Sequence, residues 1–188
     1  MTKFICETKN LSKKYKDFYA LKNVNLTIPK GEIYGLVGEN GAGKTTLIRL
    51  LTGLNFKSEG EIILFGHKDN LQHERSKIGC TIEMPALYKD MTASQNLEVQ
   101  RIQRGIPNKK CITDTLELIG LSNAGKKRVA NFSLGMKQRL ALGVALLGEP
   151  EFLILDEPVN GLDPTGIIEL RELLKKLVKE RELSLIHI

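Results

Sequence analysis

Apolar residues in the first third of the chain come in short runs that polar positions interrupt. Runs of this kind are typical of strands, and strands are expected at 4–11, 24–28, 61–65 and 78–82. Residues 32–37 (EIYGLV) form an apolar run that predicts a buried parallel strand. Glycines follow this run at once, and residues 45–54 then carry apolar residues at helical spacing. The predicted order is therefore strand, glycine-rich loop and helix.

The middle of the chain changes to a helical period. Helices are expected at 92–103, 110–119 and 133–147. The last of these places Met136, Leu140, Val144 and Leu147 on one face, and Ser133 is a good N-cap for it. A short buried strand is expected at 152–155, and Asp163 with Pro164 predicts the start of a final helix.

Strands that alternate with helices predict an α/β fold with a mostly parallel sheet and helices packed against it. The all-helical middle is interpreted as a subdomain inserted into that core. The predicted boundaries are 1–84 and 143–188 for the core and 85–142 for the helical subdomain.

Composition restricts the possible classes of protein but does not identify a function. The 188 residues are 41% hydrophobic, which is enough for a sizeable core without disulfides. The three cysteines have no paired spacing, and no run approaches the ~18 apolar residues of a membrane span. The net charge is +6, but the densest basic group, residues 126–128, is interpreted as solvated surface, and so are His67 and His73. We expect no nucleic-acid partner.

The segment GENGAGKT, Gly38 to Thr45, matches the phosphate-loop pattern G-x-x-x-x-G-K-[ST]. Glycines let backbone N–H groups turn inward around a polyphosphate, and the helix that follows points its positive end at the same anion. Lys44 is expected to reach the β- and γ-phosphates, and the Thr45 hydroxyl to bind Mg²⁺. The predicted ATP ligands here are Gly38, Glu39, Asn40, Gly41, Ala42, Gly43, Lys44, Thr45 and Thr46.

The segment FLILDEP, residues 152–158, ends a buried strand in two acids. This places carboxylates at the C-terminal edge of a parallel sheet, where ligands bind. Asp156 is expected to hold Mg²⁺, and Glu157 to orient and deprotonate an attacking water. The segment alone is a weak signal, because buried strands often end in acids.

The segment FSLGMKQR, residues 132–139, resembles the signature motif of ABC ATPases, whose usual form is LSGGQ. Ser133 offers a hydroxyl and Gly135 a bare backbone N–H at the start of a helix, so they can form a second anion site. Leu134 and Met136 depart from the commonest form. The resemblance implies that two chains pack head to tail, with each ATP between the phosphate loop of one and the signature of the other.

The resemblance covers nearly the whole chain and implies more. It implies a RecA-like P-loop NTPase core with an N-terminal antiparallel β subdomain, an Mg²⁺-dependent ATPase activity, a second ATPase subunit and a separate transmembrane permease. It implies a cytoplasmic protein held at the inner face of the membrane through that permease. Tyr15 stands where family members stack an aromatic on adenine, and Asp163 matches the D-loop at the dimer interface.

One departure from the family pattern indicates which branch of the family the chain resembles. Glu83 stands at the Q-loop position, where most members have a glutamine that contacts Mg²⁺ and links the site to the permease. Glutamate keeps an oxygen ligand and adds a charge. With this substitution and the SLGMKQR signature, the chain resembles the bacitracin and lantibiotic self-protection transporters. Our hypothesis is therefore that it powers export of a peptide antibiotic or drug. A soluble ABC ATPase, such as one for iron–sulfur cluster assembly, and a nucleotide-sensing binding module are the alternatives.

The C-terminal residues raise a separate question. The family has a histidine after the last core strand that contacts the γ-phosphate, but His187 follows Glu157 too closely and its neighbours are out of register. Residues 183–188 (LSLIHI) resemble an in-frame translation of a transposase sequencing adapter, so native sequence is expected to end near Glu182. We therefore expect no strand of the switch histidine in this C-terminally truncated chain, and weak ATP hydrolysis.

Overall fold

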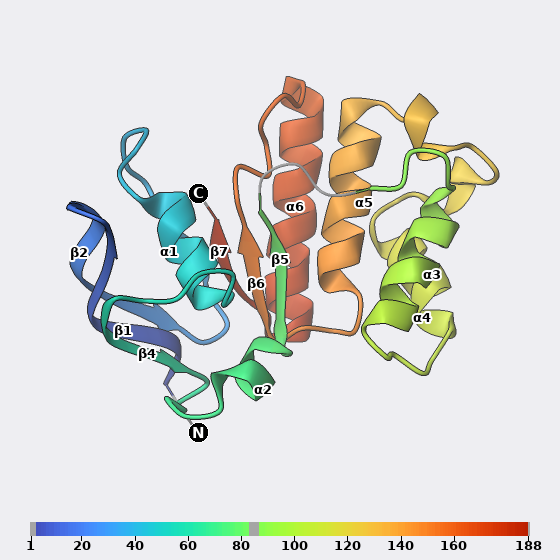
Figure 1. The fold of residues 1–188 in the computed structure, drawn as a ribbon. Coiled ribbons are helices and arrows are strands. Elements are labelled where there is room, and N and C mark those ends of the chain that lie inside the picture. The colour runs from blue at the N-terminus through green and yellow to red at the C-terminus, as the bar shows by residue number, and fades with distance from the viewer. Residues whose placement is uncertain (1–2, 83–86, 188) are drawn as a thin grey trace.

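Two sheets, one antiparallel and one parallel, form the framework of the fold (Figure 1). The structure is a computed structural model that describes residues 3–82 and 87–187. The strands are β1 Phe4–Tyr15, β2 Phe18–Pro29, β3 Ile33–Gly35, β4 Glu59–Leu64, β5 Ile78–Thr81, β6 Phe152–Leu155 and β7 Ser184–His187. The helices are α1 Lys44–Leu51, α2 Leu71–Arg75, α3 Ala93–Gln103, α4 Lys110–Leu118, α5 Leu134–Leu146 and α6 Pro164–Arg181, with 3₁₀ turns η1 Ser122–Ala124 and η2 Val129–Asn131.

The antiparallel sheet has the order β2-β1-β4. Strands β1 and β2 form a hairpin that pairs as far as Tyr15 and Phe18, well beyond the runs 4–11 and 24–28 that the apolar pattern predicts. The tip of the hairpin is exposed and carries polar residues. Backbone pairing does not need buried side chains, so the apolar pattern marks only the covered half of each strand.

The parallel sheet has the order β3-β7-β6-β5, and every neighbouring pair in it is parallel. Helix α1 lies between the two sheets (Figure 1). Its buried leucines and isoleucine share one hydrophobic cluster with both sheets; the cluster includes Ile5, Leu11, Ile28, Leu47, Ile48, Leu50, Leu51, Phe152 and Ile154. The predicted α/β core with a separate antiparallel sheet is therefore confirmed.

Strand β3 differs from its prediction. The run 32–37 predicts a buried strand, but only Ile33–Gly35 is extended, and Ile33 is 41% exposed. The reason is position: β3 is the outer strand of its sheet, and among residues 3–82 and 87–187 it pairs with β7 alone. An apolar run does not distinguish an edge strand from a central one.

Strand β7 follows the last helix, where the sequence analysis expected the strand of the switch histidine to be missing. Residues Ser184–His187 pair with β3 on one side and β6 on the other, and Leu185 and Ile186 are fully buried. Between these strands, backbone N–H and C=O groups need partners, and a short apolar segment directly after α6 supplies them.

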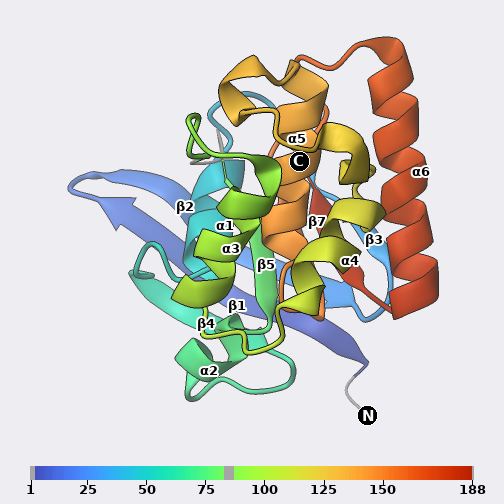
Figure 2. The ribbon, with the colours of Figure 1, turned by 90° about the vertical axis from the view of Figure 1, so that its right-hand side faces the viewer.

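Helices α5 and α6 cover the face of the parallel sheet that α1 leaves free, and α3 and α4 lie beyond α5 (Figures 1 and 2). Helix α5 packs very close to β5, because a Cβ on Gly79 would stand 2.1 Å from the Ala145 carbonyl oxygen. The helical segment has a hydrophobic cluster of its own, which includes Leu97, Ile119, Phe132 and Leu140. Helix α5 contributes to this cluster and also to the cluster beneath α6, so the predicted boundary at 142/143 falls inside one helix.

Helix α2 is a short element that the apolar pattern does not predict. Its last residue, Arg75, donates from Nε to the Leu51 carbonyl and from Nη2 to the Leu50 carbonyl, both at 3.0 Å. These carbonyls end α1, so Arg75 caps the C-terminus of the helix that follows the phosphate loop. In residues 3–82 and 87–187, no helix combines the length and the apolar character that a membrane crossing needs.

Candidate functional site

The phosphate loop connects the end of β3 with the start of α1. Gly41 and Gly43 have φ angles of +83° and +90°, a region that glycine adopts without strain. A Cβ on Gly43 would stand 2.4 Å from the Ala20 carbonyl oxygen of β2. Gly43 is also the N-cap of α1 and offers no side-chain hydrogen bond to the helix. The first N–H groups of α1 are therefore left without a side-chain cap and can bind an anion.

Lys44 extends across the loop. Its Nζ donates to the carbonyl oxygens of Gly38 at 2.7 Å and Glu39 at 2.9 Å. These two bonds hold the ammonium group at the loop, next to the start of α1, which no side chain caps. This arrangement suits the binding of a polyphosphate.

Two adjoining cavities at the phosphate loop share Thr45, Asp156 and Glu157. The first has a volume of about 380 Å³, and its remaining lining residues are Phe18, Ala20, Asn40, Gly41, Gly43, Lys44 and Thr46. The second has a volume of about 430 Å³, and its remaining lining residues are Leu134, Gln138, Asn160 and Gly161. The phosphate loop and the acids that follow β6 are thus brought to one cleft, at the C-terminal edge of the parallel sheet.

Asp156 and Glu157 lie in different environments although they are adjacent. Asp156 is buried, and its N–H donates to the Thr81 carbonyl at 3.0 Å, which continues the pairing of β6 with β5. Glu157 is exposed, has φ of +48°, and its Oε2 accepts a hydrogen bond from Asn160 Nδ2 at 2.9 Å. A buried carboxylate that lines the same cleft as Thr45 suits a cation ligand, and an exposed carboxylate in the cleft suits a base.

Phe18 is an aromatic residue at the cleft that the sequence analysis did not name, and the predicted Tyr15 lies on the same hairpin. Phe18 is 67% exposed and lines the cavity beside the phosphate loop. Tyr15 is not among the residues that line it; its hydroxyl accepts from Asn55 Nδ2 at 2.8 Å, and Lys13 Nζ lies 4.7 Å from its ring centroid. Phe18 lies between the predicted strands 4–11 and 24–28 and begins β2 in the structure, so the apolar pattern gave no signal for it.

The signature residues stand at the N-terminus of α5, as expected. The Ser133 hydroxyl accepts from the Met136 N–H at 3.2 Å, which confirms Ser133 as the N-cap. Neither Ser133 nor Gly135 lines the cleft at the phosphate loop; their neighbour Leu134 does. Asp163 caps α6 by accepting from the Gly166 N–H at 3.1 Å, with Pro164 at the first helical position.

Two predictions concern residues near the ends of β5 and β7. Glu83, the predicted Q-loop ligand, lies outside the described residues. His187 ends β7 next to β3, with its Nε2 3.8 Å from the place where a Cβ on Gly35 would stand. It is not among the residues that line the two cavities at the phosphate loop. Sequence reasoning missed Asn160 and Gln138, which carry no motif of their own.

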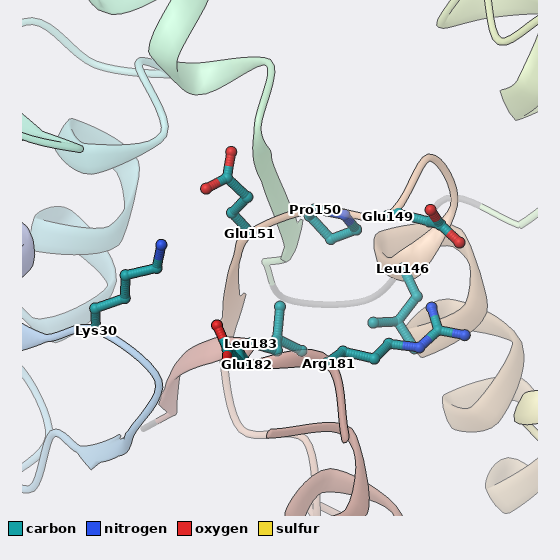
Figure 3. Close-up of a pocket in the computed structure, with 8 residues that line it drawn as sticks. All are labelled: Lys30, Leu146, Glu149, Pro150, Glu151, Arg181, Glu182 and Leu183. Atoms are coloured by element: carbon teal, nitrogen blue, oxygen red, sulfur yellow. The ribbon is translucent and has the colours of Figure 1, made fainter. Parts of the chain in front are cut away.

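A further cavity lies at the opposite edge of the parallel sheet, just before β3, β6 and β7 begin (Figure 3). It has a volume of about 480 Å³, and basic, acidic and apolar side chains all line it; they are Lys30, Leu146, Glu149, Pro150, Glu151, Arg181, Glu182 and Leu183. None of the predicted site residues that the structure describes lines it. Within the described residues, no group of three or more His, Cys, Asp or Glu side chains could hold a metal ion.

Comparison with known proteins identifies similar chains. The profile of the family described as "ABC transporter" matches residues 21–160. The chain is 45% identical over 179 residues to the bacitracin transport ATP-binding protein BcrA of Enterococcus faecalis, covering 94% of this chain and 58% of that protein. It is 47% identical over 171 residues to the lantibiotic transport ATP-binding protein SrtF of Streptococcus pyogenes, covering 91% of this chain and 74% of that protein.

A solved structure agrees with these sequence matches. The dimeric, post-hydrolysis structure of the ATP-binding cassette MJ0796 with ADP and Pi is 30% identical and has a TM-score of 0.85, covering 97% of this chain and 86% of that chain. The chain thus spans less than two thirds of BcrA but most of this compact cassette.

Proposed function

The chain belongs to the ABC transporter ATP-binding family, and on that premise we propose that it binds and hydrolyses ATP as the ATPase subunit of an export transporter. One observation supports this proposal most strongly. The phosphate loop, the Thr45 hydroxyl and the carboxylates of Asp156 and Glu157 line one cleft, although more than a hundred residues separate Thr45 from Asp156. This combination supplies what phosphoryl transfer to water requires.

Each residue of the cleft has a distinct role in this proposal. The N–H groups of the loop and of α1 bind the phosphate oxygens, and Lys44 exchanges its bonds to the Gly38 and Glu39 carbonyls for bonds to phosphate. Glu157 accepts a proton from the attacking water. Tyr15 remains our predicted adenine contact, and Phe18 adds an aromatic surface at the cleft.

Mg²⁺ is the proposed cofactor. The Thr45 hydroxyl and the Asp156 carboxylate are oxygen ligands of the kind that Mg²⁺ prefers, and both line the same cleft. When bound there with substrate phosphates, Mg²⁺ would neutralise charge that develops on the phosphoryl group. Glu83 is the proposed third ligand.

A second ATPase subunit completes the site in this proposal. Ser133 and Gly135 do not line the cleft of their own chain, so they are available to the γ-phosphate bound by a partner chain packed head to tail. Asp163 then lies at the interface between the two subunits. Hydrolysis removes charge that holds the subunits together, and they separate.

The proposed substrate is a peptide antibiotic or drug, exported through a separate permease. The bacitracin and lantibiotic names of the relatives support this class, as does Glu83 at the Q-loop position. A permease helix would bind near residues 83–88 and the helical segment, which would hold the chain at the inner face of the cell membrane. A second copy of this chain is the proposed ATPase partner.

The test is the variant Glu157→Gln, assayed for turnover of MgATP. We expect turnover to fall by about 100-fold or more, because a general base contributes roughly 10²–10⁴ in rate, while ATP binding persists. Glu180→Gln, which removes an exposed carboxylate from α6, is the matched control and should retain full turnover. Unchanged turnover in Glu157→Gln would contradict the proposal.

The transport part needs its own measurement. Co-expression with a permease of the bacitracin or lantibiotic class should raise resistance to bacitracin or a lantibiotic, and Glu157→Gln should abolish that gain. If resistance does not change while ATPase turnover is normal, the chain is an ATPase with another partner, such as a cluster-assembly complex.

A further inference from the structure

Asn160 makes two hydrogen bonds to one residue, Glu157. Its backbone N–H donates to the Glu157 carbonyl at 3.1 Å and closes a turn, and its Nδ2 donates to Glu157 Oε2 at 2.9 Å. Both side chains line the cavity that also includes Thr45 and Asp156. Asn160 thus holds the backbone and the carboxylate of Glu157 at the same time.

Glu157 is a residue whose side chain needs such a contact. It is exposed, and its φ of +48° is unusual for a residue with a Cβ. An exposed glutamate otherwise samples several rotamers, and each departure moves the carboxylate away from one place in the cleft. Within the described residues, Glu157 forms no salt bridge, so the amide of Asn160 is the contact that orients its carboxylate.

The chemical character of this contact also matters. A neutral amide donor orients a carboxylate without placing a cation beside it, and one amide hydrogen leaves the second carboxylate oxygen free to accept from water. A lysine or arginine in the same place would pair with the charge on which a base depends.

We propose that Asn160 is a positioning residue: its side chain orients the Glu157 carboxylate, which receives the proton of the attacking water. This inference rests on the proposed function, because it needs Glu157 to act as the base. The side-chain hydrogen bond from Asn160 Nδ2 orients the carboxylate for the reaction, and the backbone hydrogen bond stabilises the turn.

The isosteric variant Asn160→Asp separates these two roles. Aspartate keeps the size, the turn preference and the backbone N–H, but it presents carboxylate oxygens where the amide donated. We expect kcat for MgATP to fall by about tenfold or more in Asn160→Asp and by about three- to tenfold in Asn160→Ala. KM for ATP and the melting temperature should remain those of the wild type in both variants.

The control variants are Asn123→Asp and Asn123→Ala, at an exposed asparagine of η1 far from the site in sequence and outside the lining of the cleft. They should leave kcat, KM and the melting temperature unchanged. An unchanged or increased kcat in both Asn160 variants would overturn the inference, and so would a loss of kcat matched by a rise in KM or a lower melting temperature.

Glu157→Gln, assayed in parallel, distinguishes the two proposals. If Glu157→Gln is inactive and the Asn160 variants behave as wild type, only the positioning role fails. If Glu157→Gln keeps full turnover, the base itself is wrong, and the role of Asn160 fails with it.

The hydrogen bond between Asn160 and Glu157 can also be tested by NMR, without measuring turnover. The side-chain NH₂ signals of Asn160 in a ¹H–¹⁵N spectrum are assigned by their loss in Asn160→Asp. Glu157→Gln should shift these signals, because it replaces a charged acceptor with a neutral one. Signals that do not move would show that the contact is absent and would overturn the inference.

Discussion

The N-termini of α1 and α5 are both anion sites by sequence, yet the chain treats them differently. Helix α1 begins after Gly43, which offers no side-chain cap, and its first residues line the cleft together with Asp156. Helix α5 begins after Ser133, whose hydroxyl already accepts from the Met136 N–H. The C-terminal ends of the two helices are alike, because an arginine side chain donates to carbonyls at each. Arg75 donates to the last carbonyls of α1, and Arg104 donates to the carbonyl of Leu147, which follows α5.

This difference suggests that an uncapped helix start marks the place where a ligand supplies the missing acceptor. A capped start can still receive an anion, but only if the serine hydroxyl shares or gives up its bond. On our proposal, α1 binds phosphate within its own chain, whereas α5 offers its N-terminus to the nucleotide of a partner.

The strongest test of this comparison substitutes Gly43, the N-cap residue of α1. In Gly43→Ala, a Cβ would stand 2.4 Å from the Ala20 carbonyl oxygen at a φ of +90°. We expect the free energy of unfolding to fall by about 2–4 kcal/mol and ATP binding to be lost, because the loop must move away from β2. Urea unfolding and a nucleotide titration measure both effects.

Gly41→Ala is the matched control for this substitution. Gly41 has a similar φ of +83°, but a Cβ there meets no atom within 4 Å. Its cost is therefore only the backbone strain, about 1–2 kcal/mol. Equal losses in the two variants would show that contact with β2 does not determine the shape of the loop.

A smaller effect is expected at the other end of α1. Arg75→Met keeps the apolar stem but removes the two hydrogen bonds to the Leu50 and Leu51 carbonyls, so stability should fall by about 1–2 kcal/mol. ATP affinity should fall about two- to fivefold, because the helix that binds phosphate loses a cation at its C-terminus. Burial lowers the pKa of the Arg75 guanidinium from its usual value, which indicates that this cation is partly desolvated.

Arg104→Met provides the comparison at α5. It removes the bond to the Leu147 carbonyl and should cost similar stability while leaving ATP affinity unchanged. If both variants weaken ATP binding equally, the effect of Arg75 is global destabilisation rather than an effect on α1.

The smallest effect is expected at the capped helix starts. Ser133→Ala and Asp163→Ala should each lower stability by about 1 kcal/mol in thermal unfolding, because each removes a side-chain N-cap. ATP affinity of the isolated chain should not change in either variant, since neither residue lines the cleft. A weaker affinity in Ser133→Ala would instead place the N-terminus of α5 in the site of its own chain.

Sequence patterns predicted the parts of this molecule that depend on local chemistry. The phosphate loop, the acids after β6 and the caps at Ser133 and Asp163 all follow from residue types at fixed spacing. The α/β fold with its inserted helices followed from alternating strand and helix periods.

Features that depend on distant neighbours were not predictable in this way. The exposure of Ile33 follows from the position of β3 at the edge of its sheet, which the run 32–37 does not encode. The side chain of Asn160 reaches Glu157 because of the backbone turn between them, and Phe18 reaches the cleft because β2 passes beside Gly43. Each of these depends on tertiary geometry.

The placement of α1 between the two sheets links ligand binding to local unfolding. Side chains of α1, the antiparallel sheet and β6 form one hydrophobic cluster, while the helical segment around α3 and α4 has a cluster of its own. A nucleotide bound at α1 stabilises the native state by about 2.7 kcal/mol at a concentration of 100 Kd. That protection should extend through the shared cluster to the hairpin of β1 and β2, whereas the helical segment can still open independently while the nucleotide stays bound.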